Sequence, residues 1–144
     1  MKRLLETSKH IDAPTPALWE ALYDVARWPQ WLPTVTSVER LDGGPLSVGS
    51  RAKVGQPKLP PAVWKVSEVV DGRSFTWEAS GPGMRTIGRH EVVPDGAGSK
   101  VTLSIEQTGP LGAVAALVWR KLTRRYIELE AASLDAHVTG DPPA

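Results

Sequence analysis

The sequence predicts an α+β domain in which a curled antiparallel sheet of six to seven strands is covered lengthwise by a long C-terminal helix, with two short helices after the first strand. Three observations predict this architecture. The chain has 144 residues, the usual size of one domain. Between residues 34 and 109, short apolar segments alternate with turns rich in Gly and Pro. Residues 113–138 contain neither Gly nor Pro and are amphipathic at helical spacing.

The first strand and the two short helices are expected near the N-terminus. Residues 3–11 form the strand in this prediction, and a Pro-containing segment ends it. A helix is expected over residues 16–26, with Thr15 as its N-cap and a proline in the first helical position, where proline is tolerated. Pro29 and Pro33 limit a second helix to about one turn.

The central part of the chain is expected to form a meander. Apolar and polar side chains alternate most clearly at Val101, Leu103 and Ile105, as in a strand with one face in water. Short turn segments such as Asp42-Gly-Gly-Pro connect the strands, which favours antiparallel pairing of neighbours. The expected strands cover residues 35–41, 51–55, 63–70, 73–80, 84–93 and 101–107.

The long helix is expected from the Gly109-Pro-Leu-Gly segment to about Val138, a length of about 40 Å. Spacings of three and four predict its inner face, made of Leu111, Val114, Val118, Leu122, Tyr126, Leu129 and Ala132. A basic band is expected on the opposite side, with Glu128 and Glu130 nearby, and consists of Arg120, Lys121, Arg124 and Arg125. We interpret the band as a solvated face, and contact with an anionic partner is the alternative. Residues 1–139 are expected to form a single domain and residues 140–144 a disordered tail.

Composition excludes several classes of function. The chain has 17 basic and 16 acidic residues, so its charge does not indicate nucleic-acid binding. Without Cys it cannot form disulfides or use a thiolate. The three His residues lie on separate elements and no phosphate-binding Gly loop is present, so we expect no metal and no cofactor. The longest apolar run, residues 111–119, is too short to span a bilayer. We expect a cytoplasmic protein without membrane insertion, as a monomer or homodimer.

A curled sheet and a single helix leave a hollow between them, which is a natural place for a ligand. The chain has six Trp but only one Phe and two Tyr, which favours a bulky core, an aromatic-walled pocket, or both. Trp19 is expected in the core. The candidates for lining the pocket, with core packing as the alternative, are Trp28, Trp31, Trp64, Trp77, Trp119, Leu122 and Tyr126.

His90 is the best polar candidate, because it shares a strand face with Thr86, Gly88 and Val92. A neutral imidazole there can bind a ligand carbonyl or act as a general base, and the hydroxyl of Tyr126 is a second candidate. The alternative is a buried histidine bonded to a neighbour. The same alternation places Arg85 and Arg89 on the other face unless a bulge intervenes. Glu78 and Glu106 are also expected on the outer face.

The sequence resembles the polyketide cyclase/dehydrase branch of the START-like (SRPBCC) superfamily over residues 3–138. The residues that carry the likeness are Ile11-Asp-Ala-Pro, Leu18-Trp-Glu-Ala-Leu, Trp28-Pro-Gln-Trp-Leu-Pro, Gly49-Ser-Arg, Phe75-Thr-Trp-Glu, Gly88-Arg-His with Pro94, Val101-Thr-Leu-Ser-Ile and Gly109-Pro-Leu-Gly. The resemblance implies the helix-grip fold of birch-pollen-type allergens, a sheet wrapped around the C-terminal helix. Members bind lipids, sterols, polyketides or hormones, and some cyclise polyketides with an arginine inside the pocket. Here no arginine is clearly inward.

Three hypotheses about function follow. The first is binding of a small hydrophobic ligand, a lipid, polyketide or aromatic metabolite, oriented by His90 and Tyr126. The second is a polyketide aromatase/cyclase, in which the same two residues move protons during aldol cyclisation and dehydration. The third is a non-enzymatic module that binds a protein partner, which an exposed apolar patch outside the cavity would favour.

Overall fold

The structure is a computed structural model and describes residues 3–140. Of the tail expected at 140–144, only Gly140 lies within the described residues. The described residues form a seven-stranded curved antiparallel sheet in the order β1-β7-β6-β5-β4-β3-β2. The strands are β1 (Arg3–Ile11), β2 (Ser37–Arg40), β3 (Arg51–Gly55), β4 (Ala62–Val70), β5 (Ser74–Gly81), β6 (Met84–Asp95) and β7 (Gly98–Thr108). The α+β class and the antiparallel meander predicted from the sequence are therefore confirmed.

The strands form where alternation and turn residues predict them. Val101 and Leu103 of β7 are 0 and 1% exposed and face the core. Tight turns join β5 to β6 and β6 to β7, and Gly83 and Gly96 adopt φ values of 69° and 62° in them. Only glycine takes this backbone conformation without strain, which fixes the two turns and with them the register of three adjacent strands.

Two short helices and one 3₁₀ turn follow β1, namely α1 (Thr15–Tyr23), η1 (Val25–Arg27) and α2 (Trp28–Trp31). The prediction that Thr15 is the N-cap of α1 is wrong. Pro14 occupies the cap position and makes no side-chain bond there. The hydroxyl of Thr15 instead bonds to the Ser99 hydroxyl at 2.9 Å. Ser99 in turn donates to the carbonyl of Ala13 at 2.7 Å, which ties the start of α1 to β7.

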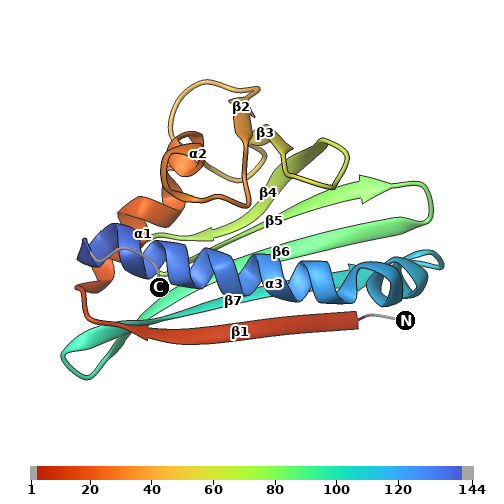
Figure 1. Cartoon of the computed structure of the whole chain (residues 1–144). Helices are drawn as coiled ribbons and strands as arrows, with labels where there is room; N and C mark the ends of the chain where they lie inside the picture. Colours follow the sequence, from red (N-terminus) through yellow and green to blue (C-terminus); the bar gives the residue numbers. More distant parts are fainter. Residues whose placement is uncertain (1–2, 141–144) are drawn as a thin grey trace.

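Helix α3 (Gly112–Thr139) runs along the sheet, and α1 and α2 lie toward one of its ends (Figure 1). The prediction of its inner face is only partly correct. Leu111, Val114 and Val118 are 53 to 66% exposed, whereas the buried side chains of the helix include Ile127 and Leu134. The cause is a kink at Trp119, whose φ of −106° and ψ of 15° are not helical and offset the two halves of the helix.

The core lies between the sheet, α1 and the second half of α3. Phe75 of β5 is fully buried at its centre and makes ring contacts with Trp19 and Trp28. Strand β4 contains a register shift between Val66 and Glu68. This bulge reverses the alternation, so Glu68 is exposed and not on the inner face that its spacing from Val66 indicates. No helix within residues 3–140 is long and apolar enough to cross a membrane.

Candidate functional site

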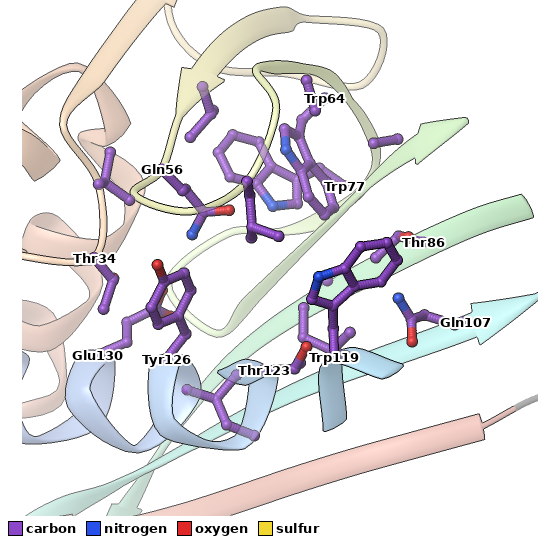
Figure 2. A pocket seen from close by; sticks show the side chains of 18 of the residues that line it. Thr34, Gln56, Trp64, Trp77, Thr86, Gln107, Trp119, Thr123, Tyr126 and Glu130 are labelled. Atoms are coloured by element: carbon purple, nitrogen blue, oxygen red, sulfur yellow. The ribbon is translucent and has the colours of Figure 1, made fainter. Parts of the chain in front are cut away.

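A cavity of about 360 Å³ lies between the inner face of the sheet, helix α3 and the loop that joins β3 to β4 (Figure 2). Its volume falls in the range of small-molecule pockets. Gln56 and Leu59 of the loop line it, and so does Met84 at the start of β6. The hollow expected from the sequence is therefore present, and the β3–β4 loop and the start of β6 border it.

Tryptophan side chains form much of the wall. Trp28, Trp64, Trp77 and Trp119 line the cavity, as the sequence predicts. The ring of Trp77 lies 5.3 Å from that of Trp28 and 5.5 Å from that of Trp64. Trp28 donates its Nε1–H to the carbonyl of Leu22 at 3.0 Å, so its one polar atom is satisfied within the protein. These walls offer flat, apolar contact surface to a guest.

Two expected pocket residues do not line the cavity. Trp31 stacks on His137 of α3 with ring centroids 5.2 Å apart and planes at 9°, whereas Trp28 lines the cavity. Leu122 is half-buried beside the lining, since the helix turns Thr123 into the cavity instead (Figure 2). Both residues contribute to packing and not to the cavity wall.

Strand β6 presents one row of side chains to the cavity. Thr86, Gly88 and His90 line it, in agreement with the expected alternation. A Cβ atom at position 88 would lie 3.2 Å from Nε1 of Trp77. Glycine at this point therefore allows the indole ring of Trp77 to approach β6 closely.

The arginines of β6 point to the outer face. Arg85 donates to the Glu78 carboxylate at 2.6 Å, and Arg89 lies 3.3 Å from the Glu91 carboxylate. Both arginine side chains are 52% exposed. Arg89 also borders the cavity, but its guanidinium is held outside by Glu91. Neither guanidinium is placed to polarise a carbonyl group inside the cavity.

His90 is held in a fixed position. Its ring stacks on Phe75 with centroids 4.3 Å apart and planes at 11°. Nδ1 lies 3.4 Å from the carbonyl oxygen of Phe75, which can only accept, so Nδ1 carries the proton in the neutral ring. Burial lowers the pKa of His90 to about 4, although the bond to Phe75 acts in the opposite direction. At neutral pH, Nε2 is therefore a free acceptor on the cavity side.

Glu130 of α3 is the partner that the sequence analysis missed. Its Oε2 lies 3.6 Å from Nε2 of His90, and its side chain is 14% exposed. Burial raises the pKa of Glu130 to about 8, because removal from water penalises the carboxylate. Desolvation disfavours both charged forms, so a neutral imidazole faces a protonated carboxyl at neutral pH. The distance exceeds that of a direct hydrogen bond, which leaves both atoms able to reach one group of a guest.

A signal for Glu130 was present in the sequence. It lies four residues after Tyr126 and three after Ile127, so it shares their face of the helix. Once Tyr126 is placed in the cavity, helical spacing brings Glu130 there too. From its charge, Glu130 was instead expected near the basic band.

Tyr126 lines the cavity, but its hydroxyl has a structural partner. The hydroxyl donates to the carbonyl oxygen of Pro57 in the loop between β3 and β4. Figure 2 shows the ring rising from α3 toward this loop, next to Gln56. Tyr126 therefore ties the mouth of the cavity to the helix, one helical turn from Glu130.

The other two histidines lie away from the cavity. Nδ1 and Nε2 of His10 are each 2.8 Å from a carboxylate, of Asp95 and of Asp12, and these bonds raise the pKa of His10. His137 stacks on Trp31. Within the described residues, no three His, Asp or Glu side chains are arranged to hold a metal ion.

Comparisons with known proteins agree with this architecture. The family described as "Polyketide cyclase / dehydrase and lipid transport" matches residues 2–139. The Zhui aromatase/cyclase from Streptomyces sp. R1128 is 14% identical, with a TM-score of 0.79 over 96% of this chain and 94% of that one. A START superfamily protein from Mycobacterium smegmatis is 16% identical, with a TM-score of 0.75 over 95 and 97%. No curated protein sequence matches the chain.

A further solved structure, a norcoclaurine synthase point mutant from Thalictrum flavum in complex with a transition state analogue, is 16% identical. Its TM-score is 0.77, over 97% of this chain and 96% of that one. At such identities the likeness extends to the fold alone. The predicted helix-grip fold is thereby confirmed.

Proposed function

The chain belongs to the family described as "Polyketide cyclase / dehydrase and lipid transport". We propose that its cavity binds a small, largely apolar molecule that carries one hydroxyl or carbonyl group. The observation that carries this proposal is the pairing of His90 with Glu130 in a cavity whose walls are otherwise mostly apolar. A single polar site in an apolar pocket fixes the orientation of a ligand.

The binding energy would come mainly from the walls. Each 100 Å² of apolar ligand surface removed from water contributes about 2.5 kcal/mol. Trp64, Trp77 and Trp119 provide flat surfaces on opposite sides of the cavity, with Trp119 on α3 and the other two on the sheet (Figure 2). A planar or ring-containing ligand therefore suits the cavity better than a charged one.

The polar pair would recognise a hydroxyl group best. Nε2 of neutral His90 accepts a hydrogen bond, and the protonated carboxyl of Glu130 donates one. A phenol or enol can donate to the first and accept from the second at the same time. A ketone would use only the donor, and a carboxylate ligand would lose its hydration without gaining a cation.

The same pair supports a second candidate, an aromatase/cyclase. In an aldol closure, Nε2 of His90 would take a proton from the carbon between two carbonyl groups, and the new carbon–carbon bond would form at a third carbonyl. Glu130 would protonate the oxygen of that carbonyl, and water would leave in the following dehydration. The outward arginines make this candidate weaker than binding, because no cation would stabilise the enolate.

Native mass spectrometry of freshly purified protein tests the proposal. We expect a non-covalent adduct of a small apolar molecule. After this molecule has been removed, the neutral dye N-phenyl-1-naphthylamine should bind at one dye per chain. His90→Ala and Glu130→Met, which remove the acceptor and the donor, should weaken binding of 1-naphthol, which carries a hydroxyl, more than binding of naphthalene, which does not. Glu128→Met, an exposed change on the same helix, serves as the control. Equal losses for both ligands, or none, would contradict the role of the pair.

A further inference from the structure

The first two turns of α3 expose an unusual amount of apolar surface. Leu111, Val114, Leu117 and Val118 expose 53, 56, 68 and 66% of their surface, and Trp119 exposes 41%. These five residues, the apolar tip, are half of the ten large apolar side chains exposed in the described part of the chain. Single exposed apolar residues need no explanation, whereas a cluster marks a contact surface.

The basic band directly follows the apolar tip along α3. Arg120 and Lys121 come immediately after Trp119, and Arg124 and Arg125 lie one helical turn further on. All four basic side chains are exposed, and within residues 3–140 none of them pairs with a carboxylate. Consecutive exposed segments of α3, on the two sides of the kink at Trp119, therefore carry apolar side chains and then four cations.

The apolar tip adjoins the cavity. Trp119 belongs both to the tip and to the cavity wall (Figure 2). The N–H of Leu111 donates to the carbonyl of Gly83 at 2.8 Å, and the next residue, Met84, also lines the cavity. Apolar surface therefore runs from the tip to the cavity wall, at the end of the molecule where β5 turns into β6 (Figure 1).

We propose that the apolar tip and the basic band dock the protein on an anionic lipid bilayer, with the tip among the upper acyl chains and the band against the headgroups. Amphipathic helices with basic residues beside an apolar face lie in this way on membranes. Trp is also enriched at the same depth. The cavity wall at Trp119 then faces the bilayer. Docking goes beyond the proposed function, because it does not depend on which molecule the cavity holds.

Charge favours a bilayer over a second copy of the chain. The outer face of α3 presents the four cations of the basic band and, at Glu128, one exposed carboxylate. A contact between two copies would leave most of this charge unneutralised. Anionic headgroups neutralise it, and each Lys or Arg near such a surface strengthens binding about fivefold.

Co-sedimentation with vesicles tests the proposal. The probes are vesicles of phosphatidylcholine alone and vesicles with about 30% phosphatidylserine, an anionic surface of the kind that basic segments bind. We expect the wild-type protein to bind only the anionic vesicles and to be released by high salt. Lys121→Gln with Arg125→Gln should weaken binding about twenty- to thirtyfold. Leu117→Ser with Val118→Ser should weaken it at least about tenfold.

A matched control separates the tip from apolar surface in general. Val63 and Val70 of β4 are 46 and 47% exposed, and Val63→Ser with Val70→Ser should leave vesicle binding unchanged. Binding of N-phenyl-1-naphthylamine, measured without vesicles, should be unchanged in all three double variants, which shows that they fold and keep the cavity.

Several results would overturn docking. These are no binding to anionic vesicles, equal binding to both kinds of vesicle, or tip variants that bind like the wild type. If the protein forms a dimer that Leu117→Ser dissociates and that anionic vesicles do not, the face serves self-association instead. If another protein covers the tip in the absence of lipid, the face binds a protein partner. Loss of dye binding with intact vesicle binding would contradict the proposed function and leave docking in place.

Discussion

Replacing Glu130 with glutamine should change how the stability of the protein depends on pH. The side chain is 14% exposed, and its nearest titratable neighbour is His90, at 3.6 Å. Glutamine keeps the size of a protonated glutamate and cannot ionise. Below about pH 4.5, where Glu130 is protonated in the unfolded chain as well as in the folded protein, Glu130→Gln should fold almost as well as the wild type, and at higher pH it should become the more stable of the two.

The magnitude follows from two pKa values. Burial raises the pKa of Glu130 from 4.5 to about 8. Between these values the unfolded chain has released the proton and the folded protein has kept it, so the free energy of unfolding falls by about 1.4 kcal/mol per pH unit as the pH rises. The slope flattens near the folded pKa. From about pH 6.5 to about pH 8, the wild type should lose about 1.5 kcal/mol relative to Glu130→Gln.

The window lies above the pKa of His90 in the folded protein. Burial lowers the pKa of His90 to about 4, so the folded protein keeps this ring neutral throughout, and its effect is the same in wild type and variant. Urea unfolding of wild type, Glu130→Gln and the control Glu128→Gln at several pH values measures the difference. Parallel curves for wild type and Glu130→Gln would show that Glu130 is already ionised in the folded protein and would refute the neutral pair.

Three other substitutions test the packing around the site. Phe75→Ala removes the fully buried ring that supports His90 and should lower the free energy of unfolding, measured with denaturant, by about 3–5 kcal/mol. A much smaller decrease would contradict the central place of Phe75 in the core. Tyr126→Phe removes the hydrogen bond to Pro57 and should speed dye entry and amide hydrogen exchange in the β3–β4 loop. The free energy of unfolding should change by no more than about 1.5 kcal/mol. Unchanged hydrogen exchange would show that this hydrogen bond does not hold the loop. Ser99→Ala leaves the carbonyl of Ala13 without its donor and should lower thermal stability by about 1–3 kcal/mol, whereas Ser104→Ala in the same strand should not.

Much of the sheet could be predicted because its signals are local. Strand β3 has the expected bounds, Arg51–Gly55, since turn residues flank it on both sides. The inward position of His90 and the outward positions of Arg85 and Arg89 follow from simple alternation along β6. Alternation is reliable there because no bulge interrupts the pairing of β6 with β5 or β7.

The errors arise where a local pattern is interrupted. The bulge after Val66 reverses the alternation of β4, and nothing in its composition marks the position. The apolar spacing along α3 was interpreted as one continuous inner face, and Val114 was therefore expected inside. The kink at Trp119 gives the two halves of the helix different faces, and Val114 is exposed. Glu130 was missed because charge indicates solvent, and only the tertiary structure shows that His90 lies across from it.

A guest molecule is expected to occupy the space between the sheet and α3. Thr123 points into this space from the helix (Figure 2). The neighbouring Arg124 is exposed. The most direct test is therefore the dye-binding stoichiometry of two matched variants, Thr123→Trp and Arg124→Trp, after their folding has been checked by circular dichroism. Thr123→Trp should fill the cavity and abolish binding of N-phenyl-1-naphthylamine, while Arg124→Trp should leave one dye per chain. Equal binding by both folded variants would show that the guest lies elsewhere.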